Sequence, residues 1–406
     1  MRQLVPAIAE VSVTGVLAAL DAAPRGWQPF ADEIIDFCDA LSFSLCATRI
    51  PDLVALGFFA RSAATSHLAS GFRECANQTT RLVPRGLVFH VAPGNVDTLF
   101  IYSWLIALLT GNRNIVRISE RSSPQVDAIC AILRELMADP IHALVAQTIR
   151  IVSYGHDDEI TRGLSASADL RVVWGGDATV LTLRAFPIRP TARDLTFPDR
   201  FSFSAVAARP FLEAPVGAHQ TIAERFFNDA FLFDQLGCAS PRLVVWCGDE
   251  ADAYAASDAF FAALARVAAA KYRIEPATLL SKLTFAHGAA IDRPVRACRR
   301  LSPEVLVVTL NDLDTFDRDH HPGGGLFFEA AVPDLTALVP FVTRKDQTMT
   351  HFGFTSDELA VFSAALGDRA LDRMVPFGRA LAFDRFWDGY DLLQELTRRV
   401  VVETSL

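Results

Sequence analysis

The stretch GLVFHVAPGNVDTLFIYSWLIALLTGNRNIVRIS, residues 86–119, decides the fold. It opens with a short apolar run at 86–92, bounded by glycine and proline, as is typical of a strand buried in a parallel sheet. A long apolar helix follows and ends at Gly111, a residue that suits a helix C-terminus. A second strand then spans 114–119. Strand, helix and strand in this order predict a parallel βαβ unit.

The same alternation continues along the chain. Ser123 and Pro124 are typical of a cap and first turn, so a helix is expected to begin there. Residues 1–80 read as mostly helical. The remaining expected strands are 148–154, 170–174, 242–248, 304–310 and 326–332, with a helix at 159–167 and an alanine-rich helix at 249–272. This pattern predicts an α/β protein with doubly wound parallel sheets.

Changes in the hydrophobic pattern along the chain predict three segments. Residues 1–208 would hold the helical N-terminal region and a dinucleotide-binding domain, and 209–370 a catalytic domain around Cys238. Residues 371–406 would return to the first domain or reach a partner subunit. The β-branched end of this tail is a candidate strand for a homo-oligomer.

Composition narrows the function classes. The 406 residues carry a net charge of −9, and no basic stripe of the kind that binds nucleic acid is present. The longest apolar run, 99–109, is shorter than the roughly 20 residues that span a bilayer. Seven scattered cysteines without a CxxC pair, and the absence of a signal-peptide pattern, predict a cytoplasmic protein. No cysteine or carboxylate cluster completes a metal site around His320 and His321, so no metal is expected and a surface loop is the simpler interpretation.

Three turns carry candidate chemistry. Two glycine-bearing turns, 90–98 and 172–180, follow strands and would lie where open α/β sheets bind ligands. The GxGxxG fingerprint is absent, and either turn alone is also ordinary turn geometry. Cys238 lies on a third turn. A cysteine there suits a nucleophile, and a buried structural thiol is the alternative.

The order of the motifs resembles the aldehyde dehydrogenase superfamily. Within it, the chain is most similar to the fatty acid (acyl-CoA) reductases of bacterial bioluminescence operons. This resemblance implies an aldehyde-dehydrogenase-like fold with a Rossmann-type domain and an α/β catalytic domain. The motifs that carry it, from about residue 85 to about 397, are PGNV, GNRNIVRIS, RVVWGGD, DQLGCASPR, GGGLFFEAAV, KDQTMTHFGF and FWDGYDLL.

The resemblance also implies roles for single residues. Cys238 would be the nucleophile, and Asn95 would form an oxyanion hole with the Cys238 backbone N–H. An asparagine that only stabilises the turn is the alternative for Asn95. The implied cofactor-binding residues are Pro93, Gly94, Arg117, Ser119, Glu120, Trp174, Gly175, Gly176 and Glu329.

The implied activity is NAD(P)H-dependent reduction of an acyl thioester to an aldehyde through an acyl-cysteine. The thiol donor would be acyl-CoA, an acyl-carrier protein or an acylated partner enzyme. Aldehyde dehydrogenases carry a water-activating glutamate before the cysteine, and 199–211 holds none, which favours reduction over acid formation. An oxidising aldehyde dehydrogenase and a catalytically silent subunit are the alternatives. NADPH is the expected cofactor, with Arg117 and Arg121 in its favour, whereas Glu120 favours NADH.

Overall fold

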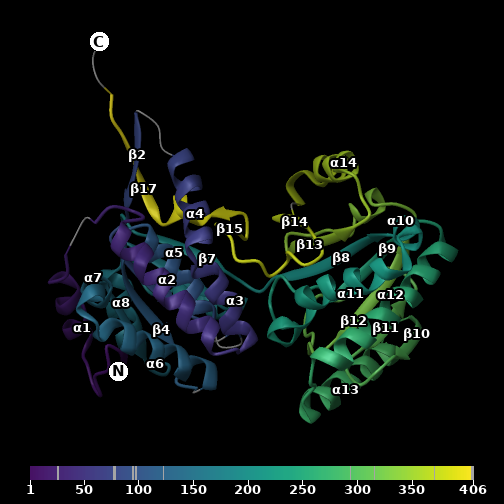
Figure 1. Ribbon diagram of the computed structural model, residues 1–406, viewed down its shortest axis with the longest axis horizontal. Coiled ribbons are helices and arrows are strands. Elements are labelled where there is room, and N and C mark those ends of the chain that lie inside the picture. The colour runs from purple at the N-terminus through teal and green to yellow at the C-terminus, as the bar shows by residue number, and fades with distance from the viewer. Residues whose placement is uncertain are drawn as a thin grey trace. The chain divides into compact units, whose positions relative to one another are not determined.

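The chain folds into two compact units in a computed structural model (Figure 1). One unit comprises Met1–Asp199 with Phe383–Leu406, and the other comprises Arg200–Ala382. We call them the nucleotide unit and the cysteine unit. The structure describes residues 1–24, 27–75, 79–93, 96, 98–121, 123–292, 294–314, 316–369 and 371–403.

The nucleotide unit is built on a six-stranded sheet with the order β1-β5-β4-β3-β6-β7. Five strands are parallel, and β1 pairs antiparallel with β5 at one edge. The chain order reverses between the neighbours β3 and β6, so the turns after these two strands flank the switch point of the sheet. The strands are β1 (Arg2–Val5), β3 (Leu87–Val91), β4 (Arg113–Ile118), β5 (Ile149–Ser153), β6 (Leu170–Trp174) and β7 (Arg193–Phe197).

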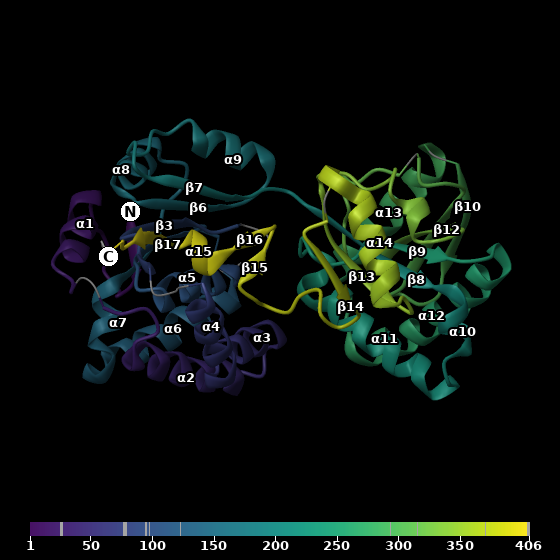
Figure 2. The ribbon, with the colours of Figure 1, turned by 90° about the horizontal axis from the view of Figure 1, so that it is seen from above.

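Helices cover both faces of this sheet (Figure 2). α1, α8 and α9 lie on one face, and α2, α3, α5 and α6 lie on the other. The Ser123 hydroxyl accepts a hydrogen bond from Val126 N at the start of α6, as the sequence predicted. The helices are α1 (Val13–Asp21), α2 (Asp32–Ala47), α3 (Pro51–Ala60), α4 (Ser62–Glu74), α5 (Leu99–Leu109), α6 (Pro124–Ala138), α7 (Ala143–Thr148), α8 (Asp158–Ser167) and α9 (Asp177–Arg184), with the 3₁₀ turn η1 (Pro140–His142).

The C-terminal residues complete the nucleotide unit. β17 (Thr397–Val401) pairs antiparallel with β2 (Thr80–Pro84), and β15 (Phe386–Trp387) forms a small hairpin with β16 (Tyr390–Asp391). The short helix α15 (Leu392–Glu395) follows β16 in the chain and precedes β17. The expected tail at 371–406 is therefore divided, because residues up to Ala382 pack in the cysteine unit.

The cysteine unit holds a seven-stranded sheet with the order β10-β11-β12-β9-β8-β13-β14. Only β10 is antiparallel to its neighbour. Side chains alternate between two cores: Val244 and Trp246 face one, and Leu243 and Val245 face the other. The strands are β8 (Phe201–Ala207), β9 (Leu243–Cys247), β10 (Val295–Arg300), β11 (Leu306–Leu310), β12 (Leu326–Val332), β13 (Asp346–Phe352) and β14 (Arg373–Pro376).

Each core of the cysteine unit is closed by its own helices. Phe226 of α11 and Phe260 of α12 pack on one face, and Ala286 of α13 and Phe362 of α14 pack on the other. The helices are α10 (Ala208–Glu213), α11 (Val216–Phe231), α12 (Glu250–Lys271), α13 (Pro276–Asp292) and α14 (Ser356–Leu366), with the 3₁₀ turns η2 (Leu232–Gln235), η3 (Thr336–Leu338) and η4 (Gly367–Arg369). Among the residues that the structure describes, no helix is both long and apolar enough to cross a membrane.

The fold class predicted from the sequence is confirmed, and the boundary differs. The units divide after Asp199 rather than after residue 208, because β8 is a central strand of the second sheet between β9 and β13. His321 is also not a solvent-facing loop residue. Its Nδ1 accepts the Gly323 N–H, and its ring packs against Phe285 and Phe328.

Candidate active site

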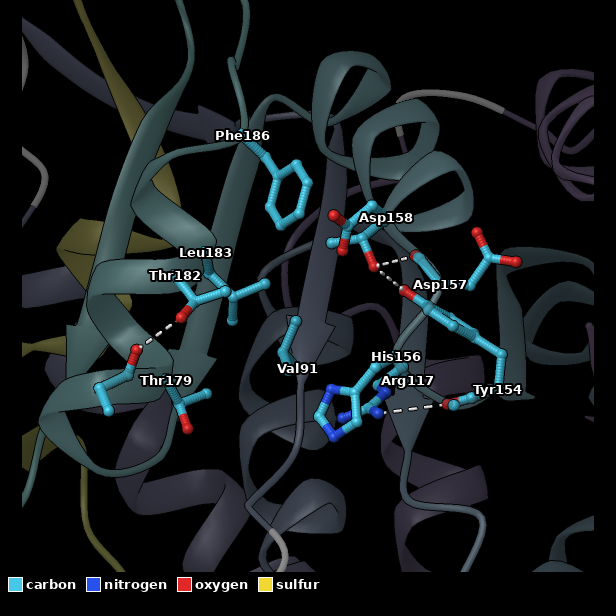
Figure 3. Close-up of a pocket in the computed structure, with 13 residues that line it drawn as sticks. Val91, Arg117, Tyr154, His156, Asp157, Asp158, Thr179, Thr182, Leu183 and Phe186 are labelled. Atoms are coloured by element: carbon cyan, nitrogen blue, oxygen red, sulfur yellow. Dashed lines mark hydrogen bonds between the residues drawn. The ribbon is translucent and has the colours of Figure 1, made fainter.

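A pocket lies at the carboxyl ends of the parallel strands in the nucleotide unit (Figure 3). Its volume is about 240 Å³, and α8 and α9 form two of its walls. The Arg117 guanidinium donates to the backbone oxygen of Tyr154 at 3.2 Å and stacks over the Tyr154 ring. The lining residues are Val91, Arg117, Tyr154, Gly155, His156, Asp157, Asp158, Thr161, Ala178, Thr179, Thr182, Leu183 and Phe186.

The turn after β6 leaves backbone open beside this pocket. Gly175 donates its N–H to the Phe197 carbonyl and borders Thr179. Gly176 is exposed, and a Cβ built on it would meet no atom within 4 Å. α9 begins at the next residue, so its unpaired N–H groups open toward this space. A phosphate group suits such a position, although Asp177 in the first helical turn lowers its attraction for anions.

Trp174 lies behind the turn rather than on its surface. Its indole is buried, stacks on Phe197 with 3.7 Å between ring centroids, and donates its N–H to the Ser103 hydroxyl. Ser103 in turn bonds His90 Nδ1, and His90 Nε2 bonds Asn114 Oδ1. Because the amide oxygen only accepts, His90 is protonated on Nε2 and Ser103 donates to Nδ1. Burial lowers the pKa of His90 to about 4, so this chain of donors holds a neutral ring.

The other predicted cofactor-binding residues at the carboxyl ends of these strands lie around the pocket. Pro93 is buried two residues after the end of β3, and the Ser119 hydroxyl accepts the Arg121 N–H. Glu120 is exposed, with its carboxylate against Gly155, a lining residue. The predicted residues Gly94 and Asn95 lie outside the described residues.

Cys238 lies on a turn of the cysteine unit, between η2 and β9, and is half-buried. The backbone before it is unusual, since Phe233, Asp234 and Gln235 all have φ between 54° and 63°. Non-glycine residues rarely adopt this region, and three in a row persist only where surrounding contacts hold them.

The Gln235 side chain supplies those contacts. Its amide is fully buried, donates to the carbonyls of Pro241 and Leu326, and accepts the Gly325 N–H. The Gly324 N–H donates to the Asp234 carbonyl from the same glycine segment. The loop that carries Cys238 is therefore fastened to the start of β12.

The glycine triplet 323–325 is required by this fastening. All three residues have φ between 65° and 77°, which favours glycine. A Cβ on Gly325 would lie 1.9 Å from the Glu304 carbonyl oxygen, and one on Gly323 would lie 2.3 Å from the Asp234 carbonyl oxygen. Lys282 donates to three carbonyls around the triplet, those of Pro303, Glu304 and Gly324, and burial lowers its pKa to about 8.

Two buried side chains contact Cys238 itself. The Ser202 hydroxyl on β8 donates to the Cys238 carbonyl at 2.7 Å. The Gln347 amide on β13 donates to Cys238 Sγ, with 3.4 Å between nitrogen and sulfur. Ser202 and Gln347 are both at most 1% exposed. The Cys238 sulfur therefore contacts a buried amide, and the Cys238 carbonyl is held by a buried hydroxyl.

Comparison with known proteins identifies the family. The model of the family described as "Acyl-CoA reductase (LuxC)" matches residues 66–284, more than half of the chain. This protein belongs to the LuxC acyl-CoA reductase family. The match includes Cys238 and the pocket of the nucleotide unit.

Curated relatives and solved structures are also similar to this chain. The "Long-chain acyl-protein thioester reductase" of Photorhabdus luminescens is 24% identical over 327 residues, which cover 79% of this chain and 64% of the relative. The chain spans between about a third and about two thirds of the length of the curated relatives it matches. Aldehyde dehydrogenase 21 from Physcomitrella patens has a TM-score of 0.69 at 12% identity, covering 98% of this chain and 91% of that one. A Mycobacterium tuberculosis aldehyde dehydrogenase complexed with NAD⁺ has a TM-score of 0.65 at 12% identity, covering 96% and 89%. These two structures show that the LuxC-family chain has the aldehyde dehydrogenase fold.

Glu329 does not fit the cofactor role inferred from the resemblance. Its carboxylate is 2% exposed and lies inside the cysteine unit. One oxygen accepts from Arg299 and Thr309, and the other accepts from Trp246 and Ser257. Both oxygens are used within the core, so neither is available to a cofactor ribose. Trp174, by contrast, stays a predicted residue of the turn, and its buried ring supports that turn from behind.

Several residues of the site carried no clear sequence signal. Gln347 lies in the motif KDQTMTHFGF and Gln235 in the motif DQLGCASPR, but neither motif indicates what these side chains contact. The residues of α8 and α9 that line the pocket match no motif. The alternating Phe-Ser-Phe-Ser at 201–204 was the available signal for β8, which positions Ser202 against the cysteine turn.

Proposed function

We propose that this protein reduces an acyl thioester to the aldehyde with NAD(P)H, carrying the acyl group on Cys238. The observation that carries the proposal is a half-buried thiol on a clamped turn, with an amide N–H directed at its sulfur. Membership of the LuxC acyl-CoA reductase family supports the reaction class. The relatives named long-chain acyl-protein thioester reductases support a long-chain acyl group.

The steps follow from thiol chemistry. The Cys238 thiolate attacks the thioester carbonyl, and collapse of the tetrahedral adduct releases the donor thiol and leaves an acyl-cysteine. We propose the Cys238 backbone N–H and the Asn95 side chain as oxyanion donors. Donors of this kind contribute about 10²–10³ in rate. After reduction of the acyl carbon, a second collapse releases the aldehyde and restores the Cys238 thiolate.

Two buried side chains beside Cys238 do not favour hydrolysis. Those of Ser202 and Gln347, which contact it, are a hydroxyl and an amide. Neither is a base at neutral pH, so neither would activate water against the acyl group. β8 has the sequence FSFSAVA and contains no glutamate. It lies in the segment that corresponds, by the resemblance, to the one where aldehyde dehydrogenases carry their water-activating glutamate.

The residues of the nucleotide unit fit one end of a nicotinamide dinucleotide. The pocket of about 240 Å³ suits a nucleoside, and the open backbone at Gly176 with the start of α9 suits the pyrophosphate. We propose that Arg117 and the pocket hold the adenosine end, and that Gly175 and Gly176 border the pyrophosphate. When bound, the cofactor supplies the hydride.

We propose NADPH as the preferred cofactor. Arg117 and His156 line the pocket and could bind a 2′-phosphate. Asp157 and Asp158 line it too, and Glu120 lies against Gly155, so these carboxylates favour NADH as the second candidate. The ratio of kcat/KM for the two reduced cofactors decides between them.

The remaining proposals concern the donor and assembly. An acylated protein is the proposed donor, with acyl-CoA and acyl-carrier protein as the other sources of the same thioester. A cytoplasmic homo-oligomer is the proposed state, since β17 places Val400 and Val401 exposed on a two-stranded ribbon. Light scattering that shows a monomer would remove the oligomer.

The deciding experiment mixes the protein with tetradecanoyl-CoA and NADPH or NADH, and follows loss of reduced-nicotinamide absorbance. We expect oxidation of the cofactor with formation of the aldehyde, and loss of at least about 10³-fold in rate for Cys238→Ala. The matched control is Cys247→Ala, a buried thiol on β9 of the same unit.

Intact mass spectrometry without cofactor provides the second measurement. A stoichiometric acyl adduct on Cys238 is expected. Absence of cofactor oxidation with acyl-CoA, acyl-carrier protein and acyl-protein donors would overturn the proposed reaction. Full activity in Cys238→Ala would overturn the nucleophile.

A further inference from the structure

Gln347 lies in a bulge where two central strands of the cysteine unit begin to pair. In the β13–β8 ladder, Asp346 pairs with Phe201 and Thr348 pairs with Ser202, so Gln347 is the extra residue. Bulges of this kind redirect a side chain and occur often beside active sites. Here the redirected side chain reaches Cys238 Sγ.

The bulge is held on both sides. Asp346 is fully buried, pairs with Arg318, and accepts the Thr343 N–H. The Gln347 carbonyl accepts the N–H of Asp372. These contacts fix the backbone of Gln347, so its amide does not have to be ordered when the sulfur becomes charged.

The orientation of the amide is also set. The Thr348 hydroxyl lies 3.4 Å from Gln347 Oε1. Because an amide oxygen only accepts hydrogen bonds, the hydroxyl is the donor. That contact places the NH₂ group toward Cys238, 3.4 Å from the sulfur. Gln347 is 1% exposed, which strengthens its interaction with a charge because water competes little for either group.

We propose that Gln347 is a catalytic residue that binds the Cys238 sulfur as a thiolate. This inference rests on the proposed function for its role in turnover, and on the 3.4 Å contact for its chemistry. The amide stabilises the thiolate before it attacks the thioester carbon. It stabilises the same thiolate again when the carbon–sulfur bond to Cys238 breaks and the aldehyde leaves.

The bonds and charges balance with the reactants of the proposed function. One carbon–sulfur bond to Cys238 forms as the bond to the donor thiol breaks. A bound reduced nicotinamide would supply the hydride to the acyl carbon. The carbon–sulfur bond to Cys238 then breaks, which releases the aldehyde and returns the thiolate. Gln347 transfers no proton, since an amide does not titrate near neutral pH. Its part is to donate an N–H to sulfur when the sulfur is negative.

The test measures the thiol without substrate or cofactor. Full-length protein is alkylated with iodoacetamide from pH 5 to 10, and the rate at Cys238 is followed by peptide mass spectrometry. Gln347→Met removes the donor at similar volume, and Gln347→Glu replaces it with a carboxylate. Thr350→Val is the control, because Thr350 is buried on the same strand and bonds Ser204 rather than the cysteine.

We expect the midpoint of the rate–pH profile to rise by about one unit in Gln347→Met, and further in Gln347→Glu. Thr350→Val should match the original protein. The other ionisable groups on neighbouring elements remain the same in every variant, so the difference reports the amide. These groups include Asp234, Arg242, His321, the Asp346–Arg318 pair and the Arg200–Asp372 pair.

Turnover gives a separate readout. With tetradecanoyl-CoA, Gln347→Met should lower kcat about 10- to 100-fold, while the Kd of NADPH stays unchanged. Superimposed alkylation profiles for the original protein and both Gln347 variants would overturn the inference. If Gln347→Met does not fold, an unshifted Gln347→Glu profile overturns it. A shifted profile in a protein that reduces no thioester would instead reject the proposed function and leave the thiolate contact standing.

Discussion

The two sheets use opposite edges for their candidate chemistry. In the nucleotide unit, the pocket lies at the carboxyl ends of β3, β4 and β5, where open α/β sheets usually bind ligands. In the cysteine unit, Cys238 precedes β9 and contacts residues near the start of β8 and β13, so it lies at the amino ends of the strands.

This difference explains why the two sites are built from different groups. Helices begin at the carboxyl edge of a parallel sheet, so α9 can offer backbone N–H groups there. Helices end at the amino edge, where carbonyl groups accumulate and disfavour negative charge. The cysteine unit supplies side-chain donors instead, with Lys282 on three carbonyls, Gln235 on two more, and Gln347 on the sulfur.

The two units should differ most in stability when one methyl group is added to a glycine in each. Gly325→Ala should cost at least about 4 kcal/mol of unfolding free energy, because the Cβ would overlap the Glu304 carbonyl and φ is 77°. Gly176→Ala should cost less than about 1 kcal/mol, because its φ is −62° and no atom lies near the new Cβ. Urea titration measures both. Equal losses would show that the glycine triplet is not required as described.

The second prediction concerns the Gln235 side chain, which fastens the Cys238 loop to the start of β12. Gln235→Leu leaves two carbonyls and the Gly325 N–H without a partner in a buried setting, so a loss of about 3–4 kcal/mol is expected. Gln394→Leu, at an exposed glutamine of the nucleotide unit, should change stability by less than about 0.5 kcal/mol. Denaturant unfolding compares them, and a loss below about 1 kcal/mol for Gln235→Leu would contradict this role.

Acid should destabilise the nucleotide unit through His90. Its pKa is about 4 in the folded protein and 6.5 in an unfolded chain, so the unfolded state binds more protons between these values. The contribution of a neutral His90 to the free energy of unfolding is therefore complete above pH 6.5. It is lost as the pH falls toward 4, by up to about 3 kcal/mol. His90→Gln should flatten this dependence, and His67→Gln, at an exposed position, should not. Identical pH profiles for all three proteins would remove His90 as the cause.

A bulky side chain in the pocket should have the smallest effect on free energy of the changes considered. Its effect should be confined to cofactor binding by the nucleotide unit. Thr179→Trp, on the pocket-facing side of α9, should weaken NADPH binding about 10- to 100-fold, because the indole would occupy the cavity. Leu181→Trp, on the same helix and exposed, is the control. Fluorescence of the bound cofactor gives Kd, and the alkylation rate of Cys238 should not change. Unaltered binding in Thr179→Trp would place the cofactor elsewhere.

Local signals in the sequence were sufficient for much of the fold. The apolar run of β3, the glycine after α5 and the Ser123–Pro124 start of α6 are each decided by neighbouring residues, so the βαβ unit could be predicted. β8 was missed because its inward-facing serines made the strand look polar. Those serines are buried and hydrogen-bonded to partners distant in sequence, such as Ser204 to Thr350.

The sequence by itself determined the βαβ alternation, the cysteine turn and the family resemblance, since each depends on residue types at short spacing. Only the tertiary structure decided what those residues contact. It buried Glu329 and Trp174 among hydrogen-bond partners, and it brought Gln347 to Cys238 through a bulge 109 residues away. Such contacts depend on the register between strands, and a shift of one residue reverses which face a side chain occupies.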